Sequence, residues 1–300
     1  MSDAARGKPA LGFVGLGAMG GAMAGKLLKA GYPLVCFDVN RERIALCAAE
    51  GAVAAESVEG AGEECDFVLT SLPSSEVFVE VAGGSLLPRA RAGQVFVDLG
   101  TTTPPDTRRL AAAFEAKGAA LVDAPVSGGP EGARRGNLHI FAGGPPSVVE
   151  RCMPILRVLG DEERIVYCGP SGCGQVVKGV NQLAMGLGAA AYLEAAAFGV
   201  LAGVSAEALL RAVGGDESWR KHFASIAGQV ARGKGEQILV KFPELPYFLQ
   251  EAEAKGIRLP LTEALYSFCK SGERKFRDNM NRATVSYWHE LLTQGSAKGE

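Results

Sequence analysis

Short apolar runs alternate with amphipathic stretches through the first 168 residues of the chain. The apolar runs, at which we expect strands, lie at 11–14, 34–38, 67–71, 95–98, 120–122, 138–142 and 165–167. Helical spacing between them predicts helices over 18–30, 41–49, 75–82, 105–117 and 147–159. Alternation of this kind is typical of βαβ units. We therefore predict an α/β fold with a doubly wound, mainly parallel sheet, helices on both faces and an edge strand of opposite direction near 138–142.

The pattern of apolar residues becomes helical after residue 168. Residues 175–202 read as one long helix or two stacked helices, and further helices are predicted over 205–213, 219–232, 244–255, 262–270 and 284–293. No later run has the spacing of a strand. The sequence thus predicts two domains, an α/β domain over 1–168 and an all-helical domain over 169–300 that begins with a long interdomain helix.

One stretch of the predicted long helix, 183–204, is apolar and about long enough to cross a bilayer. It is rich in Ala and Gly, however, and it carries Glu194 near its middle. A carboxylate at that position is costly in lipid. We therefore expect a helix that is buried between domains or subunits, and no membrane partner.

A glycine-rich turn directly follows the first apolar run. Its sequence has the GxGxxG pattern that lets a pyrophosphate approach the backbone at the start of a helix. The chain holds 40 glycines, so the pattern alone is weak, and the strand before it and the helix after it carry the interpretation. We expect the cofactor contacts of this turn to be Gly15, Leu16, Gly17, Ala18, Met19 and Gly20.

Asp38 ends the second apolar run, 23 residues after Gly15. An acid near this spacing binds the ribose hydroxyls of the adenosine half of a dinucleotide and repels a 2′-phosphate. Val39 follows, and the first arginine is Arg41, so the sequence favours NAD over NADP. The alternative interpretation is that Asp38 only forms a turn before the helix at Arg41.

Two later strand ends are further candidates for the ligand crevice. Leu72 and Pro73 follow one strand, where they either line the adenosine ribose or form an ordinary turn. Thr101 follows another, where its hydroxyl is placed to bind the nicotinamide or the substrate. Thr102 or Thr103 is placed to cap the helix that begins at the next prolines, and the two roles are compatible.

The next strand ends in a hydroxyl and two glycines, Ser127, Gly128 and Gly129. Adjacent backbone N–H groups in such a turn suit a carboxylate. A plain loop is the alternative, because the tripeptide is common.

The start of the predicted long helix carries the candidate catalytic residues, Lys178 and Asn181. They lie three positions apart and share a helical face, and Gln182 lies beside them. A desolvated lysine gives up its proton near neutral pH and can then accept one from a substrate hydroxyl. A surface lysine at a helix start is the equally supported alternative.

Together these segments resemble the β-hydroxyacid dehydrogenase family, which includes 3-hydroxyisobutyrate dehydrogenases, tartronate semialdehyde reductases and glyoxylate/succinic semialdehyde reductases. The resemblance runs from Leu11 to about Gly203 and rests on the segments Gly15–Gly20, Leu72-Pro73, Asp98–Thr101, Asp123–Gly129, Gly136–Leu138 and Gly172–Asn181. It implies an N-terminal Rossmann domain and a helical domain that forms homodimers or homotetramers.

The resemblance also implies a role for each candidate residue. Lys178 is the catalytic acid/base and Asn181 orients the substrate. Ser127, Gly128 and Gly129 bind the substrate carboxylate, and Thr101 touches the nicotinamide.

This sequence departs from the family at two places. Gln182 stands where relatives carry a second asparagine, and the Lys-Asp-Leu motif of the helical domain is replaced by Lys241-Phe-Pro-Glu-Leu-Pro. Prolines reshape a helix. We advance the hypothesis that Lys241, with Arg220 and Lys221, supplies a second contact for an acidic substrate.

Composition adds limits on partners and location. The net charge of −2 gives no electrostatic reason to expect nucleic acid. The seven cysteines form no CxxC pair, and with three scattered histidines they complete no metal-ligand pattern. No apolar leader is visible, so we expect a cytoplasmic protein with reduced thiols.

We therefore predict an NAD-dependent oxidoreductase that interconverts a small β-hydroxyacid and its semialdehyde or keto form. The alternatives are a non-catalytic NAD-binding scaffold of the same fold and an imine reductase. Relatives of the imine reductase type usually replace the catalytic lysine, and Lys178 is present here.

Overall fold

The computed structural model describes residues 7–232, 244–269, 276–277, 283–284, 287 and 291. The chain divides into two compact units, Met1–Lys178 and Gly179–Glu300. The first contains β1 (Leu11–Val14), α1 (Ala18–Lys29), β2 (Leu34–Phe37), α2 (Arg41–Ala49), β3 (Val53–Ala54), α3 (Val58–Gly62), β4 (Phe67–Thr70), α4 (Ser75–Glu80), a π-helical segment (Val81–Leu86), α5 (Leu87–Arg89), β5 (Val95–Asp98), α6 (Pro104–Glu115), β6 (Ala120–Asp123), β7 (Val126–Ser127), α7 (Gly129–Arg135), β8 (Leu138–Gly143), α8 (Pro146–Leu159), β9 (Gly160–Gly169) and the start of α9 (Cys173–Leu201).

The first unit is built on a nine-stranded sheet in which β3, β2, β1, β4, β5 and β6 lie side by side in that order. These six strands are parallel, and the order reverses between β1 and β4, as in a Rossmann fold. β8 runs antiparallel to β6, β7 pairs antiparallel with β8, and β9 pairs parallel with β8. The predicted α/β fold and the opposite direction of the strand near 138–142 are confirmed, but that strand, β8, is not at an edge, because it pairs with β6, β7 and β9.

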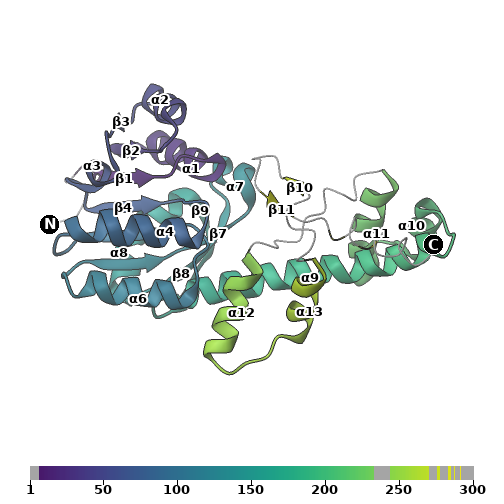
Figure 1. Cartoon of the computed structure of the whole chain (residues 1–300). Helices are drawn as coiled ribbons and strands as arrows, with labels where there is room; N and C mark the ends of the chain where they lie inside the picture. Colours follow the sequence, from purple (N-terminus) through teal and green to yellow (C-terminus); the bar gives the residue numbers. More distant parts are fainter. Residues whose placement is uncertain are drawn as a thin grey trace. The chain divides into compact units, whose positions relative to one another are not determined.

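Helices cover both faces of this sheet, because the strands are apolar on both sides. Alternate strand residues such as Leu11 and Phe13 enter a core that is closed by α1 and α8. The neighbouring residues, Val14 among them, enter a second core that is closed by α3, α4 and α6. In Figure 1, α4 and α6 lie in front of the strands. Strands that are buried on both faces explain the continuous apolar runs of the sequence.

Several short elements of the first unit escape sequence analysis. β3 and β7 have two residues each, and α3, α5 and α7 have at most seven. Segments of this length contain too few residues to show a hydrophobic period. α7 begins directly after Gly128, where the sequence indicated only a glycine turn or a loop.

The second unit is helical in its described part, apart from one small pair of strands. It contains the rest of α9, α10 (Ala206–Val213), α11 (Ser218–Ala231), α12 (Leu245–Ala254), α13 (Pro260–Cys269), β10 (Phe276–Arg277) and β11 (Ala283–Thr284). Although the sequence predicts no strand there, β10 and β11 pair antiparallel over two residues each, which is too short to leave a period of two. The helix predicted over 284–293 lies mostly outside the described residues.

Helix α9 provides the centre of the core of the second unit. Its small and apolar side chains, including Ala190 and Leu193, pack with Phe223 of α11, Leu245 of α12 and Leu265 of α13. At the start of this unit, a Cβ on Gly179 would lie 2.7 Å from the ring of Phe248, so the glycine permits α12 to approach α9 closely.

α9 is one continuous helix of 29 residues, and among the described helices it alone is long and apolar enough to cross a bilayer. Length and composition are weak evidence, because the core helix of a soluble protein meets the same criteria. About 33% of its most apolar 18-residue window is buried within this chain. Glu194, the charge within the apolar run, accepts a hydrogen bond of 2.9 Å from the hydroxyl of Tyr287.

The packing of α1 on the sheet gives a prediction on stability. A Cβ on Gly20 would lie 1.9 Å from the carbonyl oxygen of Gly15, so Gly20→Ala has to displace the glycine turn. We expect it to lower the free energy of unfolding by about 1–3 kcal/mol in denaturant titrations. The control is Gly84→Ala, since nothing lies within 4 Å of that position. Equal stability of the two variants would contradict the prediction.

Candidate active site

The glycine turn lies where the strand order of the sheet reverses. Gly15 has φ +94° and its N–H donates to the carbonyl of Phe37 at 2.9 Å, while a Cβ would lie 2.5 Å from the carbonyl oxygen of Ser71. Only glycine fits both the backbone conformation and this close approach. The turn therefore brings the end of β1 against the segment that follows β4.

No side chain of α1 compensates the unpaired N–H groups and the positive dipole end at the start of this helix. Gly17 is its N-cap without a side-chain hydrogen bond, and no acid lies in its first turn. By contrast α2, α3, α4 and α6 each have a side-chain cap and an acid in the first turn, with Asn40, Ser57, Ser74 and Thr103 as the caps. Unsatisfied N–H groups and a positive dipole end favour an anion. The residues of this turn therefore fit the pyrophosphate of a dinucleotide.

Asp38 connects β2 to this turn. It is 7% exposed, and its Oδ2 accepts the N–H of Leu16 at 2.6 Å while its Oδ1 accepts the N–H of Asn40 at 2.7 Å. Asp38 therefore does form a turn before α2, through its bond to Asn40, but the residue that caps α2 is Asn40. A carboxylate offers about four lone-pair sites, so these two bonds leave acceptor capacity for ribose hydroxyls.

Sequence reasoning missed a cation beside Asp38. Arg43, in the first turn of α2, places its Nη1 3.6 Å from Asp38 Oδ2, and a Cβ on Gly17 would lie 3.9 Å from the same nitrogen. The prediction of NAD rested on Val39 and on Arg41 as the first arginine, and it did not include Arg43. Arg43 is the third residue after the predictable helix cap Asn40, and this spacing places it in the first helical turn, on the side of Asp38.

Other strand ends converge on the same edge. The side chain of Leu72 would lie 3.1 Å from a Cβ on Gly15, and its carbonyl oxygen 3.5 Å from a Cβ on Gly100. Pro73 is exposed and Thr101 half-buried. Of the two capping candidates, Thr103 caps α6 by accepting the N–H of Asp106 at 3.2 Å. Thr102 instead donates its hydroxyl to Asp98 Oδ2 at 2.7 Å.

The predicted carboxylate-binding residues lie at the junction of β7 and α7. Gly128 and Gly129 both have positive φ, +138° and +66°. A Cβ on Gly129 would meet nothing within 4 Å, so open space lies beside this backbone. Ser127, the last residue of β7, is half-buried.

Lys178 is buried, with 6% of its surface exposed. Its Nζ donates to the carbonyl of Val126 at 2.8 Å, so the ammonium lies beside the residue that precedes Ser127. The surface interpretation of this lysine is therefore wrong, because the first turns of α9 pack against the sheet edge. The structure therefore places the side chain of Lys178 against the segment that contains Ser127.

The remaining candidates belong to the second unit. The Nδ2 of Asn181 donates to Met185 Sδ at 3.6 Å. Gln182 is 2% exposed and donates to Glu244. The guanidinium of Arg220 donates to the carbonyl of Val213 and lies over the ring of Trp219. Lys241 lies outside the described residues.

Two buried aspartates, which sequence reasoning did not assign to the site, end β5 and β6. Burial raises the pKa of Asp98 to about 6, against the hydrogen bonds from Thr102, Gly100 and Thr70, which lower it. Burial also raises the pKa of Asp123, against backbone hydrogen bonds from Gly172 and Gln175. Both carboxylates thus bind backbone N–H groups near the candidate site at the cost of desolvation.

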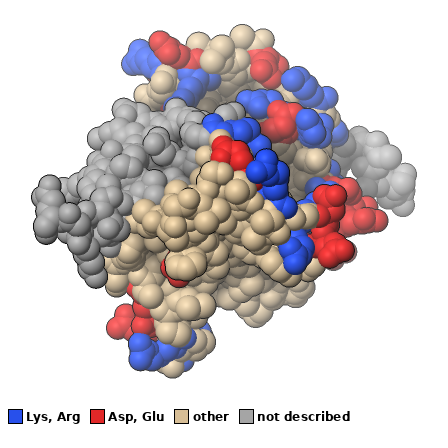
Figure 2. Space-filling view, turned by 90° about the vertical axis from the view of Figure 1, so that its right-hand side faces the viewer, with Lys and Arg blue, Asp and Glu red and all other residues tan. Residues whose placement is uncertain are grey.

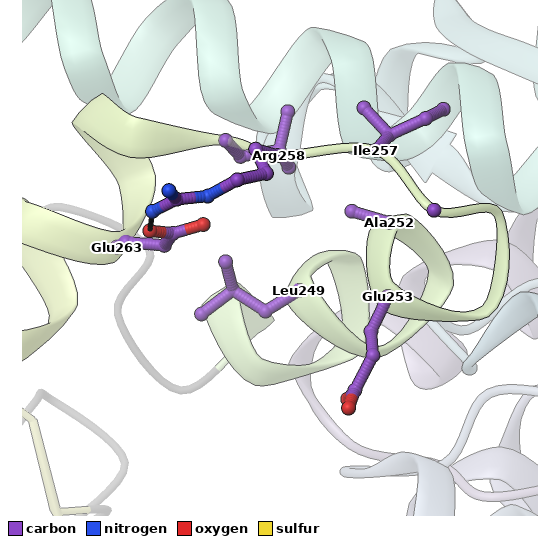
Figure 3. Close-up of a pocket in the computed structure, with 8 residues that line it drawn as sticks. Leu249, Ala252, Glu253, Ile257, Arg258 and Glu263 are labelled. Atoms are coloured by element: carbon purple, nitrogen blue, oxygen red, sulfur yellow. Dashed lines mark hydrogen bonds and ion pairs between the residues drawn. The ribbon is translucent and has the colours of Figure 1, made fainter.

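The described residues offer few other sites. No group of three or more His, Cys, Asp and Glu among them is placed to hold a metal ion. An open groove of about 440 Å³ lies between α12 and α13, lined by Leu249, Ile257 and the ion pair Arg258–Glu263, and Figure 3 shows none of the candidate site residues in it.

Charges of both signs are mixed on the surface. On the face seen in Figure 2, described Lys and Arg side chains lie beside Asp and Glu side chains. The described part of this face therefore shows no continuous basic area for a nucleic acid backbone.

The raised pKa of Asp98 gives a prediction on pH dependence. Its contribution to stability is complete below 3.8, the ordinary carboxyl pKa, and is lost as the pH rises to about 6. The loss amounts to about 1.4 kcal/mol per pH unit in this window. Denaturant unfolding between pH 4 and 7 should therefore show a flatter pH dependence for Asp98→Asn than for the wild type. Parallel curves would show that Asp98 does not titrate there.

Comparisons with known proteins agree with this arrangement. Residues 10–169 match the model of the NAD-binding domain of 6-phosphogluconate dehydrogenase. The chain is 32% identical to 2-(hydroxymethyl)glutarate dehydrogenase of Eubacterium barkeri over 97% of this chain and 98% of that protein. It is 37% identical to 3-hydroxyisobutyrate dehydrogenase of Pseudomonas aeruginosa over 65% of each.

A solved structure is similar over almost the whole chain. The 3-hydroxyisobutyrate dehydrogenase of Mycobacterium tuberculosis, determined with L-serine, superposes with a TM-score of 0.80 at 26% identity and covers 96% of this chain and 99% of its own. The glycine turn, the buried lysine and these similarities lead to one assignment: the chain belongs to the β-hydroxyacid dehydrogenase family of NAD-dependent oxidoreductases.

Proposed function

We propose that this protein interconverts a small β-hydroxyacid and the corresponding semialdehyde or keto acid, with Lys178 as the acid/base. The observation that carries the proposal is the buried ammonium of Lys178, hydrogen-bonded to the carbonyl of Val126 beside Ser127. A buried cation at the carboxyl edge of a Rossmann sheet lies where ligands bind in this fold. It is costly to desolvate, so a chemical role is the favoured explanation for it.

The substrate carboxylate is assigned to Ser127, Gly128 and Gly129. Both glycines have positive φ, and open space lies beside Gly129, so this turn has room for an anion next to its backbone. Asn181 is assigned to the oxygen that Lys178 serves, since its amide can donate or accept a hydrogen bond.

Proton transfer is the work of the protein. Bound NAD would supply the hydride acceptor for oxidation of the carbinol carbon. In its neutral form, Lys178 Nζ takes the hydroxyl proton as the carbonyl forms, and in its protonated form it returns a proton to that oxygen in the opposite direction. Ser127 and the two glycines hold the carboxylate, so the hydroxyl meets the lysine in a fixed orientation.

The cofactor is assigned to the edge described above. The backbone of Gly15, Leu16, Gly17, Ala18, Met19 and Gly20 would hold the pyrophosphate and Asp38 the adenosine ribose, with a preference for NAD over NADP. Leu72 and Pro73 would line the adenosine side, and Thr101 would contact the nicotinamide.

The similar proteins narrow the substrate class. The names 2-(hydroxymethyl)glutarate and 3-hydroxyisobutyrate both describe a primary hydroxyl on the carbon next to the one that bears a carboxylate. We assign residues 1–168 to the NAD-binding domain, which also supplies Ser127, Gly128 and Gly129 for the substrate carboxylate. Residues 169–300 are assigned to the rest of substrate binding and to assembly into a homodimer or homotetramer. All seven cysteines lie in the described residues and form no disulfide, which supports a cytoplasmic location.

The acid/base role is tested by Lys178→Ala. Turnover of an active substrate, followed at 340 nm in a panel of β-hydroxyacids and semialdehydes, should fall to a few per cent or less. The dissociation constant of NADH should stay within about twofold, since the lysine acts on the substrate. The matched control is Lys117→Ala, which also removes a lysine that donates to a backbone carbonyl, that of Pro88 at 3.1 Å.

The same assay separates the alternatives. A scaffold would bind NADH without turnover of any substrate, and an imine reductase would consume NADH with cyclic imines only. Activity of Lys178→Ala close to that of the wild type would refute the assigned chemistry.

Cofactor preference is tested at Asp38 and Arg43. Asp38→Ala removes the acceptor for ribose and releases Arg43 from its ion pair, so the guanidinium can meet a 2′-phosphate. We expect the ratio of kcat/KM for NAD to that for NADP to fall roughly 10- to 100-fold, the value of one or two charged hydrogen bonds.

The double variant Asp38→Ala/Arg43→Ala is the control for this test. This double variant should bind both cofactors weakly. The increase in relative kcat/KM for NADP that Asp38→Ala produces should be mostly lost. An unchanged cofactor ratio in Asp38→Ala would remove Asp38 from the ribose site.

A further inference from the structure

Asp123, at the end of β6, caps a helix that begins 50 residues later in the chain. Its Oδ1 accepts the N–H of Gly172 at 2.8 Å, and its Oδ2 accepts the N–H of Gln175 at 3.1 Å. The N–H of Gly174 also hydrogen-bonds this carboxylate. The side chain is 0% exposed, so these bonds form away from water. The first turn of α9 is thus attached to the end of a central strand.

The surroundings of Asp123 are built for this contact. A Cβ on Gly143, the β8 residue that pairs with Asp123, would lie 2.7 Å from both carboxylate oxygens. A Cβ on Gly174 would lie 2.2 Å from the carbonyl oxygen of Phe141 and 2.8 Å from Asp123 Oδ2. Side chains at these two positions would therefore separate α9 from the sheet.

This cap differs from the side-chain caps of other described helices. Asn40, Ser57, Ser74, Thr103 and Ser205 cap α2, α3, α4, α6 and α10 from within the same turn, and each is an uncharged residue. A local hydroxyl would satisfy the N–H groups of α9 without the cost of burying a carboxylate. Unlike a local cap, the long-range cap also fixes the start of α9 relative to the end of β6.

Gln175 extends the attachment to the neighbouring strand end. It is 0% exposed, its Oε1 accepts the N–H of Thr102 at 3.1 Å, and its Nε2 donates to the carbonyl of Gly100 at 3.0 Å. Its Nε2 also lies 3.3 Å from Asp98 Oδ2. The same helical turn is therefore bonded to the segments that follow β5 and β6.

Lys178 repeats this connection one turn later. The N–H of Gln175 donates to Asp123, and the Nζ of Lys178, three residues later on the helix, donates to the carbonyl of Val126, three residues later on the strand-end segment. Two attachments of equal spacing thus set the position of the ammonium beside Ser127.

We infer that Asp123 is a positioning residue of the reaction, whose carboxylate holds the start of α9 so that Lys178 stands at the carboxylate-binding segment. The inference rests on the proposed role of Lys178. Asp123 acts through the backbone of Gly172, Gly174 and Gln175. Its contribution is therefore to the geometry of proton transfer and not to the binding of the cofactor.

The test is Asp123→Asn in the full-length enzyme. The amide keeps the size of the side chain but exchanges one acceptor oxygen for an NH₂ group, which faces a backbone N–H. We expect kcat and kcat/KM for the hydroxyacid to fall together, by roughly 10- to 100-fold, because a small displacement of an acid/base is costly. The dissociation constant of NADH should stay within about twofold.

A second variant and a control keep the test decisive if Asp123→Asn is too unstable. Gln175→Met removes the side-chain bonds to Thr102 and Gly100 at similar length, and it should show the same division between kcat and NADH binding with a smaller loss. Ser57→Ala removes the local cap of α3 and should leave kcat unchanged. All variants are assayed below their unfolding temperatures.

The outcomes separate this inference from the proposed function. If Lys178→Ala is inactive while Asp123→Asn and Gln175→Met keep full kcat, the positioning role is wrong and the acid/base assignment stands. If NADH binding and kcat fall by the same factor in both variants, Asp123 is only structural, and the inference is overturned. If Lys178→Ala is active, the proposed function itself fails.

Discussion

Backbone N–H groups at the carboxyl edge of the parallel sheet lose their strand partners, and three buried aspartates supply acceptors for them. Asp38, Asp98 and Asp123 are the acids, and each accepts an N–H group from a segment that continues the site. Their carboxylates hold Leu16 in the glycine turn, Gly100 before the threonines and Gly172 at the start of α9. The edge at which we propose that a dinucleotide and a hydroxyacid bind is therefore held together by hydrogen bonds between carboxylates and backbone amides, formed out of contact with water.

Such an edge is rigid for a physical reason. An unpaired carboxylate in a dry site is costly, so any movement that breaks one of these bonds has to restore it elsewhere. Glycines at positions 15, 143 and 174 permit the backbone segments to come within hydrogen-bonding distance. Lys178 is held in the same way, by a carbonyl of the segment that leads to Ser127. The proposed chemical groups are thus positioned by the backbone, which varies less in position than side chains do.

The sequence predicted much of this because the first unit follows simple periodic rules. The helix over 41–49 and the strands over 11–14 and 95–98 have the predicted bounds, since buried strands leave apolar runs and helices leave amphipathic ones. Short elements such as β3 and α7 leave no such signal. The bond from Asp123 to Gly172 spans 49 residues and depends on the folded sheet, so no local pattern reveals it. The sequence indicates these bonds only through the aspartates that stand at the ends of three strands.

The Asp38–Arg43 ion pair bears on how cofactor use can change during evolution. A protein that acquires NADP binding usually has to lose an acid and gain a base. Here the base is already present within 3.6 Å of the acid. A single nucleotide change converts an aspartate codon to alanine, glycine or asparagine, so one mutational step reaches a site with a cation and no opposing charge. Position 38 is therefore the place at which a change of cofactor would need the fewest mutational steps.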